Sequence, residues 1–274
     1  MTGVRLRRSV GLTAVGVLTV GAVALHNAGA VALYQISLAT GALLFVMIVT
    51  ATLLNVRKKA PFLPLGNTTD WLTFHMVVGL GTVVVYAIHT GGRWPDGILE
   101  FALAATYWSV IATGMAGWAF SRWLAPRLAR RGENVLFERI GRFRAQLRAE
   151  AETLVLRAAS EQGSTTIPDF YAAHLADFFD RPRHLVSHAV ESDHPRHVLL
   201  GEVELLRRYL NAGERGVLDG LRELICLKDD LDYQYSGQAI LKYWLFVHIP
   251  LTYALILLGL VHGITSGAFS GGLL

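Results

Sequence analysis

Two apolar stretches of the chain carry a pair of histidines at the same spacing: residues 71–92, WLTFHMVVGLGTVVVYAIHTGG, and residues 243–264, YWLFVHIPLTYALILLGLVHGI. In each stretch the second histidine follows the first by 14 positions. Fourteen steps of about 100° return to within about 40° of the starting direction, so both histidines of a pair share one face of a helix. The four residues are His75 and His89 in the first stretch, and His248 and His262 in the second.

The spacing also sets the depth of these histidines in a membrane. A rise of about 1.5 Å per residue separates the two members of a pair by about 21 Å along the helix axis. Because the hydrocarbon layer is about 30 Å thick, one histidine of each pair lies near either side of it. Two such helices that face each other offer two levels with two imidazoles each. A b-type haem held by two axial imidazoles fits each level, so the sequence predicts two haem b groups.

The composition indicates a membrane protein. Of the 274 residues, 53% are apolar and 17% are charged, whereas about a quarter of a soluble domain is charged. The lone cysteine, Cys226, excludes a self-contained iron–sulfur cluster, a CxxCH haem attachment and an internal disulfide. The net charge of +4 does not indicate a nucleic-acid partner, because Arg and Lys collect at the ends of the apolar runs.

The pattern of apolar runs predicts an all-α fold: an integral membrane helical bundle with five transmembrane helices and a helical cytoplasmic insert. The expected domains are residues 1–121 with four spans, residues 122–238 as the insert, and residues 239–274 with the fifth span and a tail. The first apolar run also fits a secretory signal peptide, and we interpret it as a retained helix. The expected spans are approximately residues 10–25, 34–54, 71–90, 98–120 and 240–264.

The insert is polar and shows no alternating strand pattern. Apolar residues recur at helical spacing between residues 133 and 159, which predicts an amphipathic helix. Thr166, Pro168 and Asp169 favour the start of a short helix. Two more helices are expected at residues 198–210 and 217–227, broken by residues 211–213. The amphipathic face must be buried against something. We expect the insert to dock a partner or another copy of the chain, and burial of this face inside the insert is the alternative. Its residues are Leu136, Ile140, Phe143, Leu147, Leu154 and Val155.

Basic clusters predict the topology. Residues 5–8, 57–59 and 122–131 are rich in Arg and Lys, and such clusters stay on the cytoplasmic side. We therefore expect a cytoplasmic N-terminus, a cytoplasmic insert and an external C-terminus. The third and fifth spans then run in the same direction. As a result, His75 and His248 share the cytoplasmic level, and His89 and His262 share the outer level.

Small residues lie on the histidine faces of both spans. Gly79 follows His75 by one turn, and Gly259 precedes His262 by about one turn. A flat macrocycle packed against a helix needs positions without a side chain, so both glycines are candidate haem contacts. Close helix–helix packing is the alternative use of such glycines. Thr82 and Thr252 lie on the same faces, and we expect them to form hydrogen bonds between helices.

These residues carry a resemblance to a known family. The segments FHMVVG…HTGGR and VHIPL…GLVHG resemble the cytochrome b/b6 type of dihaem membrane protein. The resemblance implies haem ligation by the four histidines, glycines beside the haems, and a proline just after the first histidine of one ligand helix, as Pro250 follows His248. It covers only the third and fifth spans. The chain has no PEWY-like quinol motif, which argues against a Q-cycle role. The large insert is also foreign to that family's core.

The expected function is therefore electron transfer by a dihaem b-type cytochrome between the quinone pool and a bound redox partner. The chain would be a subunit of a membrane oxidoreductase complex in a prokaryotic cytoplasmic membrane, in contact with lipid. A haem- or metal-handling membrane protein, or a membrane anchor with structural haems, is the alternative. No residue of the chain is predicted to be catalytic.

Other polar residues have weaker interpretations. His184 and His188 have the spacing of a helical metal-binding pair, with a third ligand among Asp193, His194 and His197; solvent-facing histidines are the alternative. We interpret residues 228–232 as a solvated helix end, with docking of a basic partner as the alternative. His26 is read as solvated at an interface, and Arg93 and Trp94 as an interfacial anchor.

The topology yields a direct prediction. A reporter fused after Leu274 should behave as external, and one inserted at Gly163 should behave as cytoplasmic, because the basic clusters hold the ends of the spans on the cytoplasmic side. Alkaline phosphatase and green fluorescent protein activities of the two fusions measure this. A C-terminal fusion that fluoresces in the cytoplasm would remove the expected depth matching of the histidines.

Overall fold

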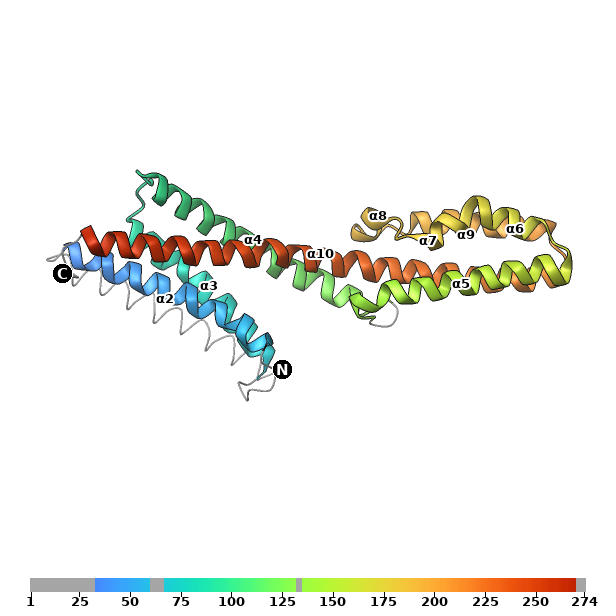
Figure 1. The fold of residues 1–274 in the computed structure, drawn as a ribbon, viewed down its shortest axis with the longest axis horizontal. Helices are drawn as coiled ribbons and strands as arrows, with labels where there is room; N and C mark the ends of the chain where they lie inside the picture. The colour runs from blue at the N-terminus through green and yellow to red at the C-terminus, as the bar shows by residue number, and fades with distance from the viewer. Residues whose placement is uncertain (1–32, 60–66, 132–134, 270–274) are drawn as a thin grey trace. The chain divides into compact units, whose positions relative to one another are not determined.

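A computed structural model describes residues 33–59, 67–131 and 135–269, which form helices joined by short turns and loops, with no strand among them. The all-α class is therefore confirmed. The elements (Figure 1) are α2 (Leu33–Lys59), α3 (Thr68–Thr90), α4 (Ile98–Leu128), α5 (Phe137–Gln162), α6 (Thr166–Phe170), the π-helical turn η1 (Tyr171–Leu175), α7 (Ala176–Asp180), α8 (Leu185–Ala189), α9 (His194–Leu206), the 3₁₀ turn η2 (Arg207–Tyr209) and α10 (Ala212–Phe269).

Four helices are long and apolar enough to cross a membrane: α2, α3, α4 and α10. Most of their apolar side chains are not buried within the chain; Leu80, Phe101 and Leu257, for example, are each at least 60% exposed. Such a surface belongs in lipid rather than in water. The four helices contain the second to fifth expected spans, whereas the expected first span and His26 lie outside the described residues.

The chain divides into two compact units. Unit 1 comprises Met1–Met115 and Phe246–Leu274, and unit 2 comprises Ala116–Leu245. The sequence placed the corresponding boundaries at residues 121/122 and 238/239, where the apolar runs end. The divisions fall inside α4 and α10 because each helix continues without a break from apolar into polar sequence.

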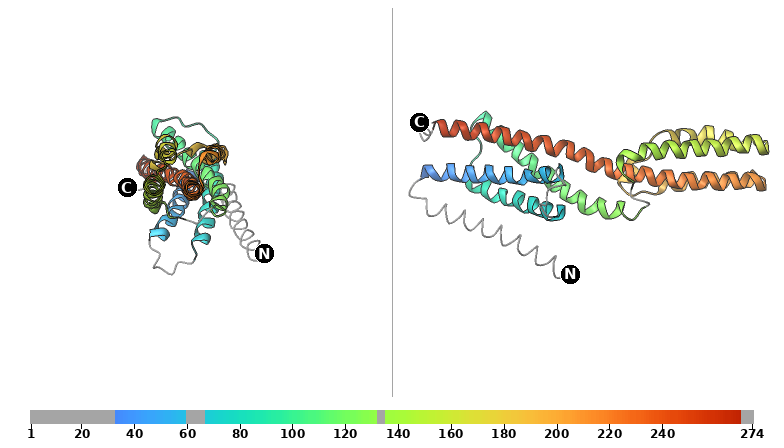
Figure 2. Two further views of the ribbon diagram at one scale, coloured as in Figure 1. Left: turned by 90° about the vertical axis from the view of Figure 1, so that its right-hand side faces the viewer. Right: turned by 60° about the horizontal axis from the view of Figure 1, so that its bottom comes forward.

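In unit 1, α2 packs lengthwise against α3 (Figure 2). Leu44 and Met47 of α2 bury their side chains against Val78 and Val85 of α3. Gly81 makes the close approach possible, because a Cβ atom there would lie 3.1 Å from the terminal methyl group of Met47. These contacts fix α3, which carries His75 and His89, relative to α2.

Unit 2 has its own hydrophobic core, to which α5, α6, α7, α9 and the first part of α10 contribute. Its most buried members are Ala151, Ala158, Ile167, Leu175, Phe179, Leu218, Leu221 and Ile225. The amphipathic face of α5 joins this core: Leu147, Leu154 and Val155 pack in it. Leu136 and Phe143, however, are 63% and 40% exposed. The insert therefore buries most of this face itself, which was the alternative to docking through it. Docking of a partner or a second copy by the insert stays a prediction.

A reciprocal pair of side-chain bonds starts α10. The backbone N–H of Asn211 donates to the Glu214 carboxylate at 2.8 Å, and the Glu214 N–H donates to the Asn211 side-chain oxygen at 2.9 Å. This is a capping box, which satisfies the first free N–H groups of a helix. A break between helices is therefore present, but it lies at residues 210–211, and residues 212 and 213 of the predicted break already belong to α10. The helix predicted to end at residue 227, in contrast, continues to Phe269.

The C-terminal end of α4 is closed by a buried amide. The Gln234 side chain, 2% exposed, donates hydrogen bonds of 2.8 Å to the carbonyls of Leu128 and Arg131. The last carbonyls of a helix have no partner inside it, and a buried end needs one. The Arg131 guanidinium in turn lies within 3.1 Å of the carboxylates of Asp193, Asp229 and Asp230.

The interpretation of residues 228–232 as a solvated helix end is wrong. Lys228, Asp229 and Asp232 are at most 2% exposed. The Lys228 ammonium donates to the Asp232 carboxylate and to the Arg181 carbonyl, and it lies 4.0 Å from the centre of the Phe178 ring. Burial lowers the pKa of Lys228 and raises the pKa of Asp232, while their mutual attraction opposes both shifts. The sequence shows the charges, but only the fold shows that they pair inside a core.

This pair predicts a large stability effect. Lys228→Met leaves Asp232 buried without its cation, and breaking a buried ion pair from one side costs about 3–5 kcal/mol. We expect a clear fall in the melting temperature of the purified protein, which intrinsic fluorescence measures. Lys242→Met is the matched control, because the Lys242 side chain is 42% exposed and pairs with an exposed carboxylate, Glu138. Equal melting temperatures for the two variants would contradict the stabilising role of the Lys228–Asp232 pair.

Candidate functional site

The structure brings the four histidines of unit 1 together in two pairs. The imidazole centres of His75 and His248 lie 6.3 Å apart with an angle of 82° between the rings. Those of His89 and His262 lie 6.4 Å apart with an angle of 86°. Each pair joins α3 to α10. Because the first histidines of both helices meet, and likewise the second, these parts of α3 and α10 run in the same direction.

Both separations leave room for one metal ion that would bind a ring nitrogen of each histidine, since a metal–imidazole bond is about 2.0 Å long. The donor set, two neutral nitrogens and no carboxylate or thiolate, is that of a low-spin b-type haem. The residues present therefore fit this group at both levels.

The second ring nitrogen of a ligand histidine is normally hydrogen-bonded, which fixes the tautomer and aims the other nitrogen at the metal. The Nδ1 atom of His75 lies 2.8 Å from the backbone carbonyl oxygen of Ala51. That of His89 lies 3.1 Å from the carbonyl oxygen of Ser37. A carbonyl can only accept, so in both histidines Nδ1 carries the proton and Nε2 keeps its lone pair. Both acceptors belong to α2, a helix without predicted site residues.

At His248 the partner of Nδ1 is a hydroxyl group instead of a backbone carbonyl. The Oγ1 atom of Thr113, on α4, lies 2.9 Å from the Nδ1 atom of His248. A second threonine, Thr40 on α2, places its Oγ1 atom 3.2 Å from the Nδ1 atom of His89. Each pair of histidines thus includes one member that contacts a threonine from a neighbouring helix.

Glycine follows each of these threonines. A Cβ atom at Gly41 would lie 2.8 Å from the Cε1 atom of His89, and one at Gly114 would lie 3.6 Å from the Cε1 atom of His248. These two threonines and two glycines lie in spans without an expected ligand histidine, so the histidine spacing did not predict them. A signal was present: the tripeptide Ala-Thr-Gly occurs at residues 39–41 in the second span and again at residues 112–114 in the fourth.

The two predicted glycine contacts differ in their surroundings. A Cβ atom at Gly79 would meet nothing within 4 Å, so the surface of α3 one turn from His75 is open. A Cβ atom at Gly259 would lie 3.2 Å from the ring of Phe45. Gly259 thus accommodates the packing of α2 against α10, which was the alternative use of these glycines. A haem contact at Gly79 or Gly259 stays a prediction.

Aromatic side chains cluster where α4 meets the part of α3 between its two histidines. The rings of Tyr86 and Tyr107 stack with centres 4.3 Å apart, and Trp108 lies edge-on to both. The Thr82 hydroxyl lies 3.1 Å from the Tyr107 hydroxyl, so the expected bond between helices exists there. Thr252 instead donates to the His248 carbonyl of its own helix at 2.8 Å, and that expectation of a bond between helices is wrong.

The histidines of the insert do not form the helical metal-binding pair that their spacing suggested. His184 precedes α8 with a left-handed backbone (φ 56°), so it does not share a helical face with His188. His188 is 5% exposed, and burial lowers its pKa to about 4, whereas burial raises the pKa of the neighbouring Asp229 to about 6. Among the residues that the structure describes, no three His, Cys, Asp or Glu side chains form a group that could hold a metal ion.

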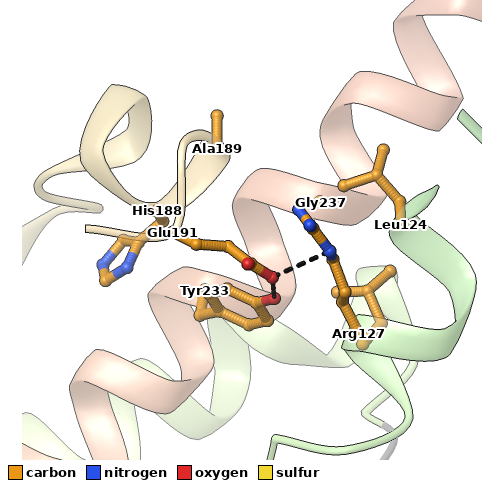
Figure 3. A pocket seen from close by; sticks show the side chains of 8 residues that line it. Leu124, Arg127, His188, Ala189, Glu191, Tyr233 and Gly237 are labelled. Carbon is orange, nitrogen blue, oxygen red and sulfur yellow. Dashed lines mark hydrogen bonds and ion pairs between the residues drawn. The ribbon is translucent and has the colours of Figure 1, made fainter. Parts of the chain in front are cut away.

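A small cavity lies beside His188 (Figure 3). There the Glu191 carboxylate accepts a hydrogen bond from Tyr233 and pairs with Arg127 at 3.0 Å. The cavity has a volume of about 10 Å³, which is room for one water molecule. This cluster ties the segment after α8 to α4 and α10 within unit 2, and it is too small for a substrate.

Comparison with protein-family models, with curated proteins and with solved structures finds no match to this chain.

Proposed function

We propose that the chain is a dihaem b-type cytochrome of a membrane. His75 and His248 hold one haem, and His89 and His262 hold the other. The observation that carries the proposal is the pairing of imidazoles at 6.3 and 6.4 Å in two places. Ionisable side chains are rare inside membranes and mark functional sites. Two pairs with the same metal-compatible separation are difficult to explain by helix packing alone.

In this proposal the protein positions the two haems and sets their redox potentials. A bound haem b supplies a one-electron redox centre, and the chain's residues set its potential through the axial nitrogens and their surroundings. Hydrogen bonds that Nδ1 donates to oxygen atoms of α2 and α4 hold three of the four imidazoles in the orientation that presents Nε2. Tyr86, which lies between the two histidines of α3, packs with Tyr107 and Trp108 of α4.

Electrons pass between the two levels and leave through partners. The chain has no dinucleotide fingerprint and no cysteine cluster, so it requires a redox partner on each side of the transfer. Quinone is the lipid-soluble partner, and a bound redox protein or another subunit of an oxidoreductase complex is the second. The full topology of this proposal has five spans in a prokaryotic cytoplasmic membrane, with the N-terminus and unit 2 inside and the C-terminus outside.

Haem stoichiometry tests the proposal. Purified protein should contain two low-spin haems b per chain. His75→Ala or His248→Ala should remove one of them, and His89→Ala or His262→Ala the other, because each variant leaves one iron without an axial ligand. The pyridine haemochrome assay and electron paramagnetic resonance measure the content and identity of the haems.

The control for this experiment is His197→Ala. His197 is an exposed histidine of α9 in unit 2, so its loss should leave both haems in place. A wild-type protein without haem would overturn the proposal. If His75→Ala and His89→Ala removed the same haem, the pairing across α3 and α10 would be wrong. Reversible titration of both haems, with reduction by a quinol analogue, distinguishes an electron carrier from a haem-handling protein, which would release haem readily.

A glycine substitution should act on one level only. Gly41→Ala places a methyl group 2.8 Å from the Cε1 atom of His89, closer than carbon atoms can approach, so the imidazole must move. We expect a lower content of the outer haem or an altered spectrum, with the inner haem unchanged. Gly114→Ala is the matched control, since its methyl group would make an ordinary contact at 3.6 Å with His248. Equal effects of the two substitutions would contradict the geometry.

A further inference from the structure

We infer that two threonines outside the ligand helices, Thr113 and Thr40, are positioning residues that lower the redox potential of the inner and outer haem, respectively. Each accepts a hydrogen bond from the Nδ1 atom of one axial histidine. The inference rests on the proposed function, and it assigns to α2 and α4 a role in tuning that function.

The Thr113 hydroxyl is oriented by its own helix. Its Oγ1 atom donates to the carbonyl oxygens of Ser109 and Val110, at 2.8 and 3.0 Å. With its single proton directed there, the oxygen can only accept from another group. The Nδ1 atom of His248, at 2.9 Å, must therefore be the donor. This bond selects the tautomer of His248 in which Nε2 keeps the lone pair that a metal requires.

Thr40 repeats the arrangement at the outer level. Its Oγ1 atom donates to the Ser37 carbonyl at 3.1 Å and lies 3.2 Å from the Nδ1 atom of His89. Here the same carbonyl is also within 3.1 Å of His89 Nδ1. His89 thus has two acceptors, of which one is a backbone group that no substitution removes. Loss of the Thr40 hydroxyl should consequently matter less than loss of the Thr113 hydroxyl.

The bonds have an electronic consequence. An acceptor at Nδ1 draws the proton away from the ring, which raises the basicity of Nε2 toward the metal. A more basic axial ligand stabilises the ferric iron relative to the ferrous iron, so the midpoint potential falls. The hydrogen bond lies in a membrane span, where no water competes for the imidazole donor. Its removal should therefore raise the potential of the haem concerned.

The glycine after Thr40 completes the outer site. A Cβ atom at position 41 would lie 2.8 Å from the Cε1 atom of His89, so a residue without a side chain lets this imidazole approach the helix closely enough to reach Thr40. At position 114 a Cβ atom would make only an ordinary contact with the His248 ring. The approach of His248 to Thr113 therefore does not depend on the glycine.

Redox titration of full-length variants in detergent, followed spectroscopically, tests the inference. Thr113→Val keeps the side-chain volume and removes the hydroxyl, and it should raise the midpoint potential of the inner haem alone. Thr113→Ser keeps the hydroxyl and should restore the wild-type value. Thr40→Val should raise the outer potential alone, by a smaller amount. The His75→Ala and His262→Ala variants, each retaining one haem, assign the two potentials to the two levels.

Thr106→Val is the control on the same helix, because the Thr106 hydroxyl donates to the Ala102 carbonyl of α4. Both potentials should stay unchanged in this variant.

If Thr113→Val bound two haems with unchanged potentials, the inference would fail while the proposed function stood. If both potentials shifted together in Thr113→Val, the cause would be a general distortion of the protein, and the inference would be overturned. Thr113→Val could also lose the inner haem. In that case the inference would be overturned if Thr113→Ser failed to restore the haem, or if Thr40→Val left both potentials unchanged. Wild-type protein without haem would overturn both proposals.

Discussion

The arrangement of the membrane part depends on one constraint: an imidazole inside a lipid bilayer needs partners for both of its ring nitrogens. Water is absent there, and an unpaired polar group costs several kcal/mol. In this protein α2 and α4 provide the partner for Nδ1, from carbonyls at Ala51 and Ser37 and from the Thr113 hydroxyl. The facing histidine of each pair lies where a shared metal would satisfy Nε2. The four helices are therefore linked through the histidines as well as through apolar packing.

This constraint explains why small residues occur where they do. A carbonyl or a short hydroxyl reaches an imidazole only if the helix backbone comes close, and Gly41 permits that approach beside His89. Gly81 and Gly259 instead accommodate Met47 and Phe45, side chains of α2. Glycine thus has two uses in the same bundle, and its neighbours in space distinguish them.

Unit 2 satisfies its polar groups differently. Its core contains a buried lysine, Lys228, and two buried aspartates, and each charge is paired or bonded to backbone. Buried charges of this kind are costly unless fully partnered, and they favour one arrangement of the surrounding helices. One helix, α10, supplies residues to both units. Its sequence changes along the way, from charged residues that pair inside a protein core to apolar residues suited to lipid.

The sequence by itself determined the all-α class, the four described spans, the break before α10 and the shared faces of the histidines. These features depend on hydropathy and on helical periodicity, which are local properties of the chain. The common direction of α3 and α10 also followed, since basic residues at span ends set the orientation of each span before any contact forms. The continuation of α10 beyond residue 227 did not follow, because a helix that passes from one environment to another shows no single period.

Only the tertiary structure decided which residues surround the histidines and which charges are buried. Thr40 and Thr113 lie in other spans than the histidines that they contact, so no spacing along the chain relates them. Lys228 and Asp232 have the same local sequence signature as an exposed ion pair, and the enclosing residues Phe178 and Arg181 are nearly 50 positions away. Hydrogen-bond partners and burial are properties of contacts between distant segments, and periodicity carries no information about them.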